Sequence, residues 1–428
     1  MSSDIVITHG LRTPLAKAGT ALRRVSAVEL GRQAVAELVA RADLDPQRID
    51  EVIVGCAGNP IDAANVGRVV ALRANLPRSI PAMTVQRNCG SGLEAITSAA
   101  ERIRAGRAQV IVAGAVESMS NYPLLYSAAA TRQFERLFRA RPSAAKLAAL
   151  LGFRPRHFKP DIALLTGLTD PVCGLNMGET AEVLAKEFDI SRDAQDAFAL
   201  RSHQRAVAAE QAGFFDDERI PLFLPPTHAE VIEQDVGPRV GQSLEALGKL
   251  RPAFDRRFGT VTAGNACMVT DGAAATLVMA AHTAQDLGYE PLGRVAGYAW
   301  AGLAPRRMGL GPCYAVPGAL GEAGRTLEQM ERVEINEAFA AQVIACQLCL
   351  RSSSFARDKL GLAAPVGAIP DARLNVNGGA IALGHPVGVT GARLVITLLH
   401  EMKRNGLRHG LATMCIGGGQ GGVVVLER

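Results

Sequence analysis

A strand and a helix meet in Thr84-Val-Gln-Arg-Asn-Cys-Gly-Ser-Gly-Leu-Glu-Ala-Ile-Thr-Ser-Ala-Ala100. The apolar run from Ile80 to Val85 predicts a strand, and it breaks at Asn88-Cys-Gly-Ser-Gly92. Small and aliphatic residues then predict a helix that ends near Arg104, and they indicate that this helix is buried on several sides. A strand that turns directly into a buried helix is typical of a layered α/β protein.

A cysteine occupies the break between this strand and this helix. Unpaired backbone N–H groups and the helix dipole at a helix start favour a thiolate, so we expect a lowered pKa and a nucleophilic Cys89. The alternative interpretation is a free cysteine buried in the core.

The same alternation of strands and helices surrounds this stretch. Continuous Val and Ile segments predict strands, and apolar residues at helical spacing predict helices between them. The pattern predicts a largely parallel sheet with both faces covered. The predicted strands are 4–9, 51–55 and 109–115, and the predicted helices are 27–42 and 65–74.

The alternation stops between residues 118 and 254, where we expect an inserted helical domain. Its best helices are predicted at 180–188 and 192–213. Within the insert, the segment from Arg132 to Lys159 carries eight Lys and Arg residues against the single acid Glu135. Apolar side chains interleave with these charges. A solvated helix face, a membrane-surface segment and a partner-docking segment all suit this composition.

The second half of the chain resembles the first in its pattern. Arg332-Val-Glu-Ile-Asn-Glu-Ala-Phe-Ala340 again predicts a strand that breaks into a small-residue helix, and Asn336 stands where Cys89 stands in the first half. We therefore expect a duplicated fold, with a site where the two breaks meet.

Two further segments carry reactive groups beside glycine. His385 lies in a glycine-rich segment before a predicted helix, and Cys415 precedes the run Gly417-Gly-Gly-Gln-Gly-Gly422. A histidine beside a cysteine provides a base and a nucleophile, and flexible glycine lets backbone N–H groups approach an oxyanion. The glycine run lacks the Lys-Ser/Thr of a phosphate loop, and Cys346-x-x-Cys349 lacks the second ligand pair of a zinc site.

Bulk properties exclude several classes of protein. A chain of 428 residues, 48% hydrophobic and 20% charged, suggests a globular protein of two or three domains. It has no apolar run of membrane-spanning length and no secretory signal pattern. Eight scattered cysteines fit reduced thiols in the cytoplasm. The net charge of +5 suits an anionic substrate and does not argue for nucleic acid.

Together these segments resemble the thiolase family nearly from end to end. The motifs are Arg12-Thr-Pro14, Asn88-Cys-Gly-Ser-Gly92, Gly178-Glu-Thr-Ala-Glu182, Gly259-Thr-Val-Thr-Ala-Gly-Asn265, Asp271-Gly-Ala-Ala274, Asn336-Glu-Ala-Phe339, Gly384-His-Pro386 and Cys415-Ile-Gly-Gly-Gly419. The segment Tyr122-Pro-Leu-Leu-Tyr126, the basic insert and Arg201-Ser-His-Gln-Arg-Ala206 are most similar to the branch that serves the fatty-acid β-oxidation multienzyme complex.

This resemblance implies a thiolase fold: two similar α/β domains in a five-layer αβαβα arrangement with a helical loop domain. The expected domains are 1–117 with 255–283, 118–254, and 284–428. The implied reaction is thiolysis of 3-ketoacyl-CoA by CoA to acetyl-CoA and a shortened acyl-CoA, with no permanently bound cofactor. The alternatives are biosynthetic acetoacetyl-CoA formation and, more distantly, a non-catalytic acyl-CoA or lipid carrier.

The resemblance also implies a role for each motif residue. Cys89 would be acylated, His385 would take its proton, and Cys415 would exchange a proton at C2 of the acetyl unit. Asn336 would hold a water for the enolate oxygen, and the N–H groups of Cys89 and Gly417 would form a second oxyanion hole. The positions that match the CoA pocket are Met177, Arg239, Phe254, Cys267 and Phe339.

Partners and pH dependence complete these expectations. A homodimer or tetramer is implied, together with a hydratase/dehydrogenase partner subunit or peripheral membrane contact through Arg132 to Lys159. If His385 is the base, activity should fall as it protonates near its reference pKa of about 6.5.

Overall fold

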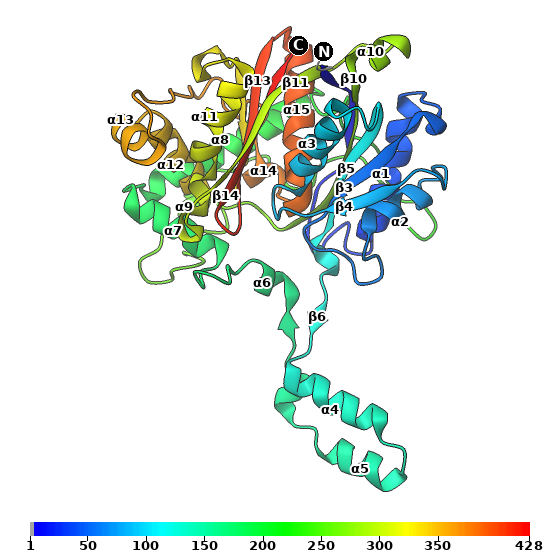
Figure 1. Ribbon diagram of the computed structural model, residues 1–428. Coiled ribbons are helices and arrows are strands. Elements are labelled where there is room, and N and C mark those ends of the chain that lie inside the picture. The colour runs from blue at the N-terminus through cyan, green and yellow to red at the C-terminus, as the bar shows by residue number, and fades with distance from the viewer. Residues whose placement is uncertain (1–3) are drawn as a thin grey trace.

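One mixed sheet organises the computed structural model, which describes residues 4–428 (Figure 1). The strand order is β12-β13-β14-β11-β1-β10-β5-β3-β4, and the short strand β2 pairs with β10. The bounds are β1 Ile5–Arg12, β2 Ala16–Lys17, β3 Glu51–Gly55, β4 Ala82–Val85, β5 Val110–Ser118, β10 Thr270–Ala280, β11 Gly293–Gly302, β12 Arg332–Ile335, β13 His409–Ile416 and β14 Gln420–Glu427.

The two halves of this sheet repeat the same pattern of pairing. In the first half β1 and β10, and then β10 and β5, pair antiparallel, whereas β5 and β3 pair parallel. In the second half β11 and β14, and then β14 and β13, pair antiparallel, whereas β13 and β12 pair parallel. The halves join where β1 meets β11 over two residue pairs. The predicted duplication of the fold is confirmed.

The prediction of a largely parallel sheet was wrong. Parallel pairing is confined to β3 with β4 and β5, and to β12 with β13. The cause is that helices cover both faces of each half, so every strand is a continuous apolar run whatever its direction. Continuous burial, as in β10, where all eleven residues are buried, therefore does not distinguish the two directions.

Helices form three layers around the two halves of the sheet and complete the predicted five-layer arrangement. One apolar core joins α1 and α2 to the outer face of the first half, and another joins α11 and α12 to the outer face of the second half. The third core, between the halves, is built around α3 and α15. The bounds are α1 Ala27–Arg41, α2 Val66–Arg73, α3 Ser91–Arg104, α10 Ala281–Asp286, α11 Gly311–Ala323, α12 Ala340–Leu350, α13 Ser353–Phe355, α14 Ala380–Leu383 and α15 Thr390–Asn405.

The central pair of helices corrects one correspondence between the halves. Helix α3 precedes β5 and α15 precedes β13, and these strands hold equivalent places in the two halves. The counterpart of Cys89 is therefore the segment at His385 that leads into α15. Asn336 follows β12, the counterpart of β3, so the expectation that Asn336 matches Cys89 was wrong. Both breaks have a small-residue helix after a strand, and sequence pattern alone did not tell them apart.

The insert between β5 and β10 packs along one end of both halves. Its elements are β6 Leu124–Leu125, α4 Ala128–Arg139, α5 Ser143–Leu151, β7 Asp161–Ile162, α6 Ala163–Gly167, α7 Met177–Glu187, α8 Arg192–Gln211, β8 Leu222–Phe223, β9 Val231–Ile232 and α9 Leu244–Gly248. Fully buried Arg12 on β1 ties the insert to the sheet, because it donates to Glu218 at 2.5 Å and to Asp235 at 2.8 Å.

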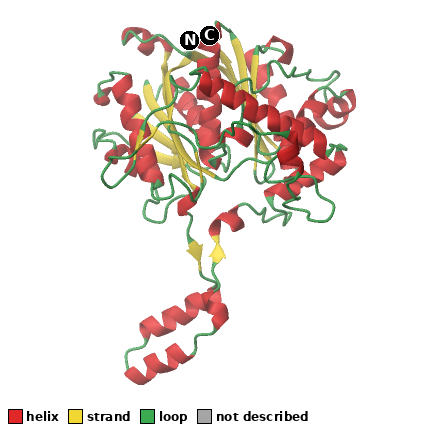
Figure 2. Ribbon diagram, turned by 180° about the vertical axis from the view of Figure 1, so that it is seen from behind, coloured by secondary structure: helices red, strands yellow, loops and turns green. Residues whose placement is uncertain are grey.

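Part of the insert leaves the body as an arm (Figures 1 and 2). Strands β6 and β7 form a two-stranded ribbon in which Leu124 pairs with Ile162, and α4 and α5 lie beyond it. Apolar side chains of the arm stay uncovered: Phe138 is 94% exposed and Leu151 is 78% exposed. The body of the protein therefore does not cover the amphipathic basic segment. Of the helices within residues 4–428, none combines the length and hydropathy of a membrane span.

The central layer rests on a close approach of α3 and α15 at their first turns. A Cβ added to Gly391 would lie 2.6 Å from the backbone nitrogen of Leu93, and one added to Gly92 would lie 2.8 Å from the carbonyl oxygen of Gly388. Neither contact is with the end of a flexible side chain, so the backbone itself would have to move.

We expect Gly391→Ala to lower the free energy of unfolding by about 1–3 kcal/mol, because overpacking a tight core strains it. The matched control is Gly321→Ala in α11, where a new Cβ meets nothing within 4 Å. That control should stabilise by up to about 1 kcal/mol, since alanine is the better helix former. Urea unfolding of both variants tests this, and equal effects would contradict the role given to the close approach.

Candidate active site

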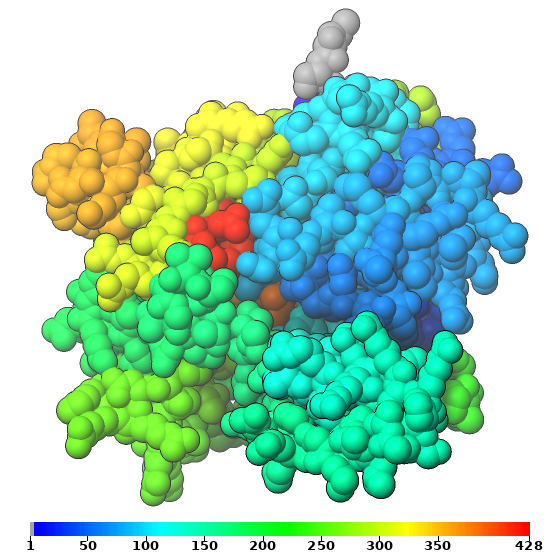
Figure 3. Space-filling model, turned by 60° about the horizontal axis from the view of Figure 1, so that its bottom comes forward, coloured from blue at the N-terminus to red at the C-terminus, as the bar shows by residue number. Residues whose placement is uncertain are grey.

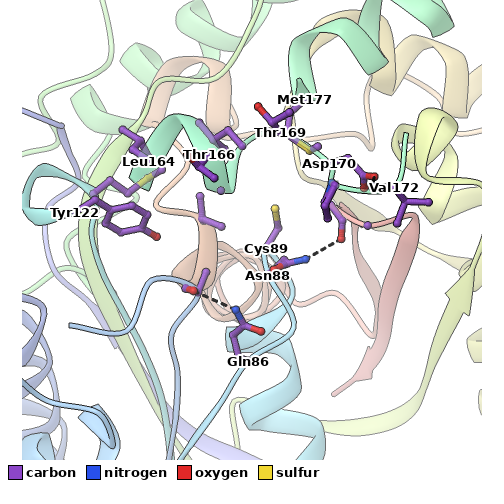
Figure 4. Close-up of a pocket in the computed structure, with 18 residues that line it drawn as sticks. Gln86, Asn88, Cys89, Tyr122, Leu164, Thr166, Thr169, Asp170, Val172 and Met177 are labelled. Carbon is purple, nitrogen blue, oxygen red and sulfur yellow. Dashed lines mark hydrogen bonds between the residues drawn. The ribbon is translucent and has the colours of Figure 1, made fainter. Parts of the chain in front are cut away.

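A strained turn presents Cys89 at the start of the central helix α3. Asn88 has a φ of 46°, a left-handed conformation that asparagine tolerates better than most residues. Ser91 closes the turn: its hydroxyl donates to the carbonyl of Asn88 at 2.7 Å and accepts from the N–H of Arg87 at 2.9 Å. The Cys89 side chain consequently points away from the helix and into a cavity (Figure 4).

This cavity has a volume of about 640 Å³ and lies where the two halves meet the insert. Figure 3 views this end of the molecule, with the C-terminal strands in red between the earlier parts of the chain. Tyr122, Leu164 and Thr166 lie on one side of Cys89, and Met177 lies on the other (Figure 4). The remaining lining residues are Ala57, Gln86, Asn88, Met119, Gly167, Leu168, Thr169, Asp170, Pro171, Val172, Val387, Gly417 and Gly418.

The surroundings of Cys89 do not favour a free thiolate. Burial raises the pKa of the Cys89 thiol, the N–H of Gly417 that faces the sulfur acts against this rise, and the nearby charge of Glu117 adds to it. The expectation of a lowered pKa was wrong because the helix start is buried, and desolvation penalises the charged form. Cys89 therefore rests as a neutral thiol and needs a base.

His385 is the nearby candidate base, held by the strand segment that follows Cys267. Its backbone N–H donates to the carbonyl of Met268 at 3.1 Å, and its Nδ1 lies 2.6 Å from Oγ1 of Thr390. The bond to Thr390 occupies Nδ1 and leaves Nε2 for proton exchange. Burial, and secondly the charge of Arg393, lower the pKa of His385 to about 3. The expectation that His385 titrates near its reference pKa was therefore wrong. His385 is neutral at physiological pH.

Cys415 and the glycine run reach the same place from β13 and β14. Cys415 is buried at the end of β13, and burial together with the proximity of Cys89 raises the pKa of its thiol. The turn that follows has φ values of 88° at Gly418 and 79° at Gly419. Asn88 Nδ2 donates to the carbonyl of Gly417 at 2.9 Å, which ties the turn to the Cys89 loop (Figure 4).

Asn336 lies just beyond β12 and is completely buried. Its backbone N–H donates to the carbonyl of Thr413 at 3.0 Å, two residues before Cys415. Neither its Oδ1 nor its Nδ2 has a hydrogen-bond partner among the residues described. Buried amides are almost always paired, so an unpaired one near two cysteines suits a group that meets water or substrate.

Four of the five positions expected to contact CoA lie together. Met177, Phe254 and Phe339 form one apolar cluster with Cys415, and the rings of Phe254 and Phe339 meet edge to face at 6.0 Å. Cys267 adjoins this cluster through its N–H, which donates to the carbonyl of Ala338 at 3.0 Å. Burial and then the nearby Cys89 raise the pKa of Cys267 to about 12, so it is a neutral wall residue.

Arg239 is the expected contact that lies apart from this cluster. It is exposed on the loop after β9, and its backbone N–H donates to Nδ1 of His203 at 3.3 Å.

The sequence analysis did not predict a role for two residues at the cavity: Tyr122 in its wall and Glu117 behind that wall. Tyr122 lines the cavity, and its hydroxyl donates at 2.8 Å to Glu117, a carboxylate buried behind the wall. A signal was present, since Glu117 is the one charged residue in the apolar strand 110–118. An acid inside an otherwise apolar strand requires hydrogen-bond donors, and the sequence pattern does not show which residues provide them.

Comparison with known proteins agrees with this geometry. Sequence models described as the thiolase N-terminal and C-terminal domains match residues 5–282 and 289–428. An acetyl-CoA acetyltransferase of Pseudomonas aeruginosa is 43% identical over 99% of both chains. A 3-ketoacyl-CoA thiolase of Erwinia tasmaniensis is 40% identical over 99% of this chain and 96% of its own.

The solved structures with a similar fold carry the same two kinds of name as these relatives. The acetyl-CoA acetyltransferase of Bacillus anthracis has a TM-score of 0.86 at 37% identity, covering 100% of this chain and 99% of its own. Human mitochondrial 3-ketoacyl-CoA thiolase in complex with CoA has a TM-score of 0.84 at 34% identity, covering 99% of this chain and 98% of its own.

The neutral state of His385 predicts a pH dependence of stability. Its pKa of about 3 in the folded protein lies below its value in the unfolded chain, so below pH 6.5 only the unfolded chain gains the proton. The resulting loss of stability is roughly 2 kcal/mol at pH 5. Urea unfolding between pH 7 and 5 should therefore show a shallower pH dependence in His385→Asn than in the unchanged protein.

The exposed His282 provides the control, because His282→Asn should leave the pH dependence as it was. If His385→Asn and the unchanged protein lose stability in parallel on acidification, His385 is not a buried neutral imidazole.

Proposed function

The chain belongs to the thiolase family, and we propose on that premise that Cys89, His385 and Cys415 carry out thiolysis of 3-ketoacyl-CoA. The protein is an acyltransferase, an acetyl-CoA C-acyltransferase, that uses CoA as co-substrate. The observation that carries the assignment of roles is the proximity of the two cysteines Cys89 and Cys415, and the neutral imidazole of His385 and the unpaired amide of Asn336 support it.

Acylation of Cys89 is the first half-reaction. The Cys89 sulfur attacks C3 of the ketoacyl group while its proton passes to Nε2 of His385. Thiol and imidazole are both neutral at rest, so proton transfer accompanies attack instead of preceding it. Cleavage of the C2–C3 bond leaves its electron pair on C2 as an enolate, and Cys415 gives its proton to C2 to release acetyl-CoA.

Two separate groups of donors suit the two oxygens that gain charge. A water held by Asn336, with the protonated His385, would stabilise the enolate oxygen. The N–H groups of Cys89 and Gly417 would stabilise the tetrahedral oxyanion when CoA attacks the acyl-enzyme. In that second step the Cys415 thiolate takes the CoA proton, and the departing Cys89 sulfur regains its proton from His385.

The CoA site follows the same assignment. Met177, Phe254, Phe339 and Cys267 would enclose the pantetheine arm, and Arg239 would meet the anionic end outside. An apolar enclosure with a cation at its mouth suits an anionic thioester. No permanently bound cofactor enters this scheme.

The direction of the reaction in the cell has two candidates. Relatives of similar identity are named for both: 3-ketoacyl-CoA thiolase and acetyl-CoA acetyltransferase. We favour degradation in fatty-acid β-oxidation, because Leu164 and Leu168 are among the residues that line the cavity at Cys89, and its volume of about 640 Å³ has room for an acyl chain. Acetoacetyl-CoA synthesis is the alternative. A non-catalytic carrier would not need the reactive groups described above.

Assembly and location form part of this proposal. We retain the division into residues 1–117 with 255–283, 118–254 and 284–428 as the domain arrangement. Strand β4 is the edge of the sheet, and its four residues are partly exposed, so its unpaired backbone groups support a homodimer or tetramer through this edge. Eight free cysteines support a cytoplasmic location.

The arm supports a docking role. Exposed Phe138, Leu147 and Leu151 share α4 and α5 with basic residues, and Lys146 lines a groove with Phe134 and Phe138. We favour a hydratase/dehydrogenase partner that would hand over 3-ketoacyl-CoA, and contact with an anionic membrane surface is the second candidate.

The roles of the two cysteines are tested by replacing each one. Cys89→Ala should abolish thiolysis and covalent labelling by ketoacyl-CoA, because no nucleophile remains. Cys415→Ala should still form the acyl-enzyme when mixed with acyl-CoA, but should not exchange deuterium into C2 of acetyl-CoA. Mass spectrometry of the intact protein and NMR of acetyl-CoA measure these outcomes. An acyl group trapped on Cys415 in the unchanged protein would refute the assignment.

The docking role is tested with Arg136→Gln, Phe138→Ser and Arg139→Gln combined. We expect thiolysis of a short ketoacyl-CoA to stay nearly unchanged, and binding to the partner chain or to anionic vesicles to weaken. Binding by the unchanged protein should also decline with salt. Pull-down and vesicle sedimentation measure this.

The matched control removes two arginines and one exposed apolar residue from the body: Arg23→Gln, Arg24→Gln and Ile61→Ser. If the arm variant loses activity or unfolds, and the unchanged protein binds neither probe, the docking role is wrong.

A further inference from the structure

Glu117 is the buried acid that the reaction scheme above does not use. It lies at the end of β5 and is completely buried. Its Oε1 accepts from the N–H of Gly58 at 3.0 Å and from the hydroxyl of Tyr122 at 2.8 Å. Its Oε2 accepts from the N–H groups of Ala57 and Gly388, each at 3.0 Å.

These four donors come from three segments that build the Cys89 cavity. Ala57 and Tyr122 line the cavity themselves, and Gly388 directly follows Val387, which also lines it. Gly388 lies three residues after His385. The Tyr122 ring packs so closely on Gly58 that a Cβ there would lie 2.1 Å from the ring. One carboxylate therefore joins the loop after β3, the start of the insert and the segment between His385 and α15.

The arrangement is that of an ionised carboxylate. All four donors direct their hydrogens at the two oxygens, so a proton on either oxygen would face one of these hydrogens. Burial raises the pKa of Glu117, and the hydrogen bonds from Tyr122, Ala57, Gly388 and Gly58 act against that rise. Two or three backbone N–H bonds already keep a carboxylate ionised, and Glu117 accepts three of them as well as the Tyr122 hydroxyl.

Glu117 is also the charge that acts on the Cys89 sulfur. The neighbouring titratable groups are neutral: burial raises the pKa of Tyr122, Cys267 and Cys415, and it also raises the pKa of Cys56, whose Sγ lies 4.0 Å from Oε1 of Glu117. Burial lowers the pKa of His385. A negative charge that acts from behind the cavity wall opposes thiolate formation at Cys89 before substrate is present.

We propose that Glu117 is a positioning residue for the Cys89 cavity: its carboxylate braces the cavity wall at Ala57, Tyr122 and Gly388, and its charge holds back the reaction of the Cys89 thiol until substrate binds. Its effect on turnover rests on the proposed function, whereas its effect on the thiol does not. A resting thiol reacts slowly with oxidants and electrophiles, because the thiolate is the reactive form. The cysteine is then activated only when its proton can pass to His385 during attack.

The test uses the alkylation of Cys89 by iodoacetamide as a function of pH, with the modified peptide identified by mass spectrometry. In Glu117→Gln the negative charge is lost, and an amide NH₂ faces two donors that no longer have an acceptor. We expect the alkylation profile to move to lower pH, with Cys89 reacting about tenfold faster at pH 7.5 if its pKa falls by one unit. We also expect kcat for thiolysis to fall at least tenfold.

Two further variants keep this test decisive. Glu401 is a buried carboxylate on α15 that accepts from Arg332 and Asn377, and Glu401→Gln should leave the Cys89 alkylation profile in place. Glu117→Asp keeps the negative charge, but the shorter side chain moves the carboxylate away from its hydrogen-bond donors. The alkylation profile should therefore stay near that of the unchanged protein, whereas kcat should fall.

A folded Glu117→Gln variant with unchanged alkylation profile and unchanged kcat would overturn the proposal. If Glu117→Gln does not fold, wild-type kcat in Glu117→Asp would overturn it as well. Failure of the unchanged protein to cleave ketoacyl-CoA would instead refute the proposed function, and the alkylation result would stand by itself.

Discussion

The close contact between α3 and α15 is the constraint on which the other parts of the structure depend. The two halves of the sheet pack on this pair from opposite sides, so the helices are buried and their first turns must meet without side chains between them. Gly92 and Gly391 allow that approach. Because each helix follows a loop that carries a proposed reactive residue, the same contact holds the loop of Cys89 beside the segment that follows His385. The packing of the central core and the placement of these two loops therefore depend on the same contact between the helices.

Burial of this contact also determines the chemistry. A helix start in water would favour a thiolate, but here desolvation keeps Cys89 and His385 neutral. In the proposed reaction, the site would therefore start from an uncharged pair and separate charge only as bonds change. In the same proposal, donors that are already in place, such as the N–H of Gly417, would stabilise charge that exists only briefly.

The sequence was sufficient for the fold class, and it supplied the candidate reactive groups, but it did not predict their surroundings. Cys89, His385 and Cys415 stand in short motifs whose glycines and helix starts are local, so they could be found without coordinates. The strand directions, the true counterpart of Cys89 and the low pKa of His385 depend on which segments pack together, since burial in the tertiary fold is the main cause of that low pKa. Glu117 shows the same limit: its four partners come from positions 57 to 388 and share no pattern.

The two-stranded ribbon of β6 and β7 separates the arm from the body of the protein, which holds the cavity at Cys89. Leu124 and Ile162 pair directly, so the chain leaves the body and returns to it at neighbouring points. Everything between them can lengthen, shorten or change its surface without moving the ends that the body holds. The arm can therefore change in evolution independently of the body. Selection can alter the surface that the arm presents to other molecules while the chemistry at Cys89 stays unchanged.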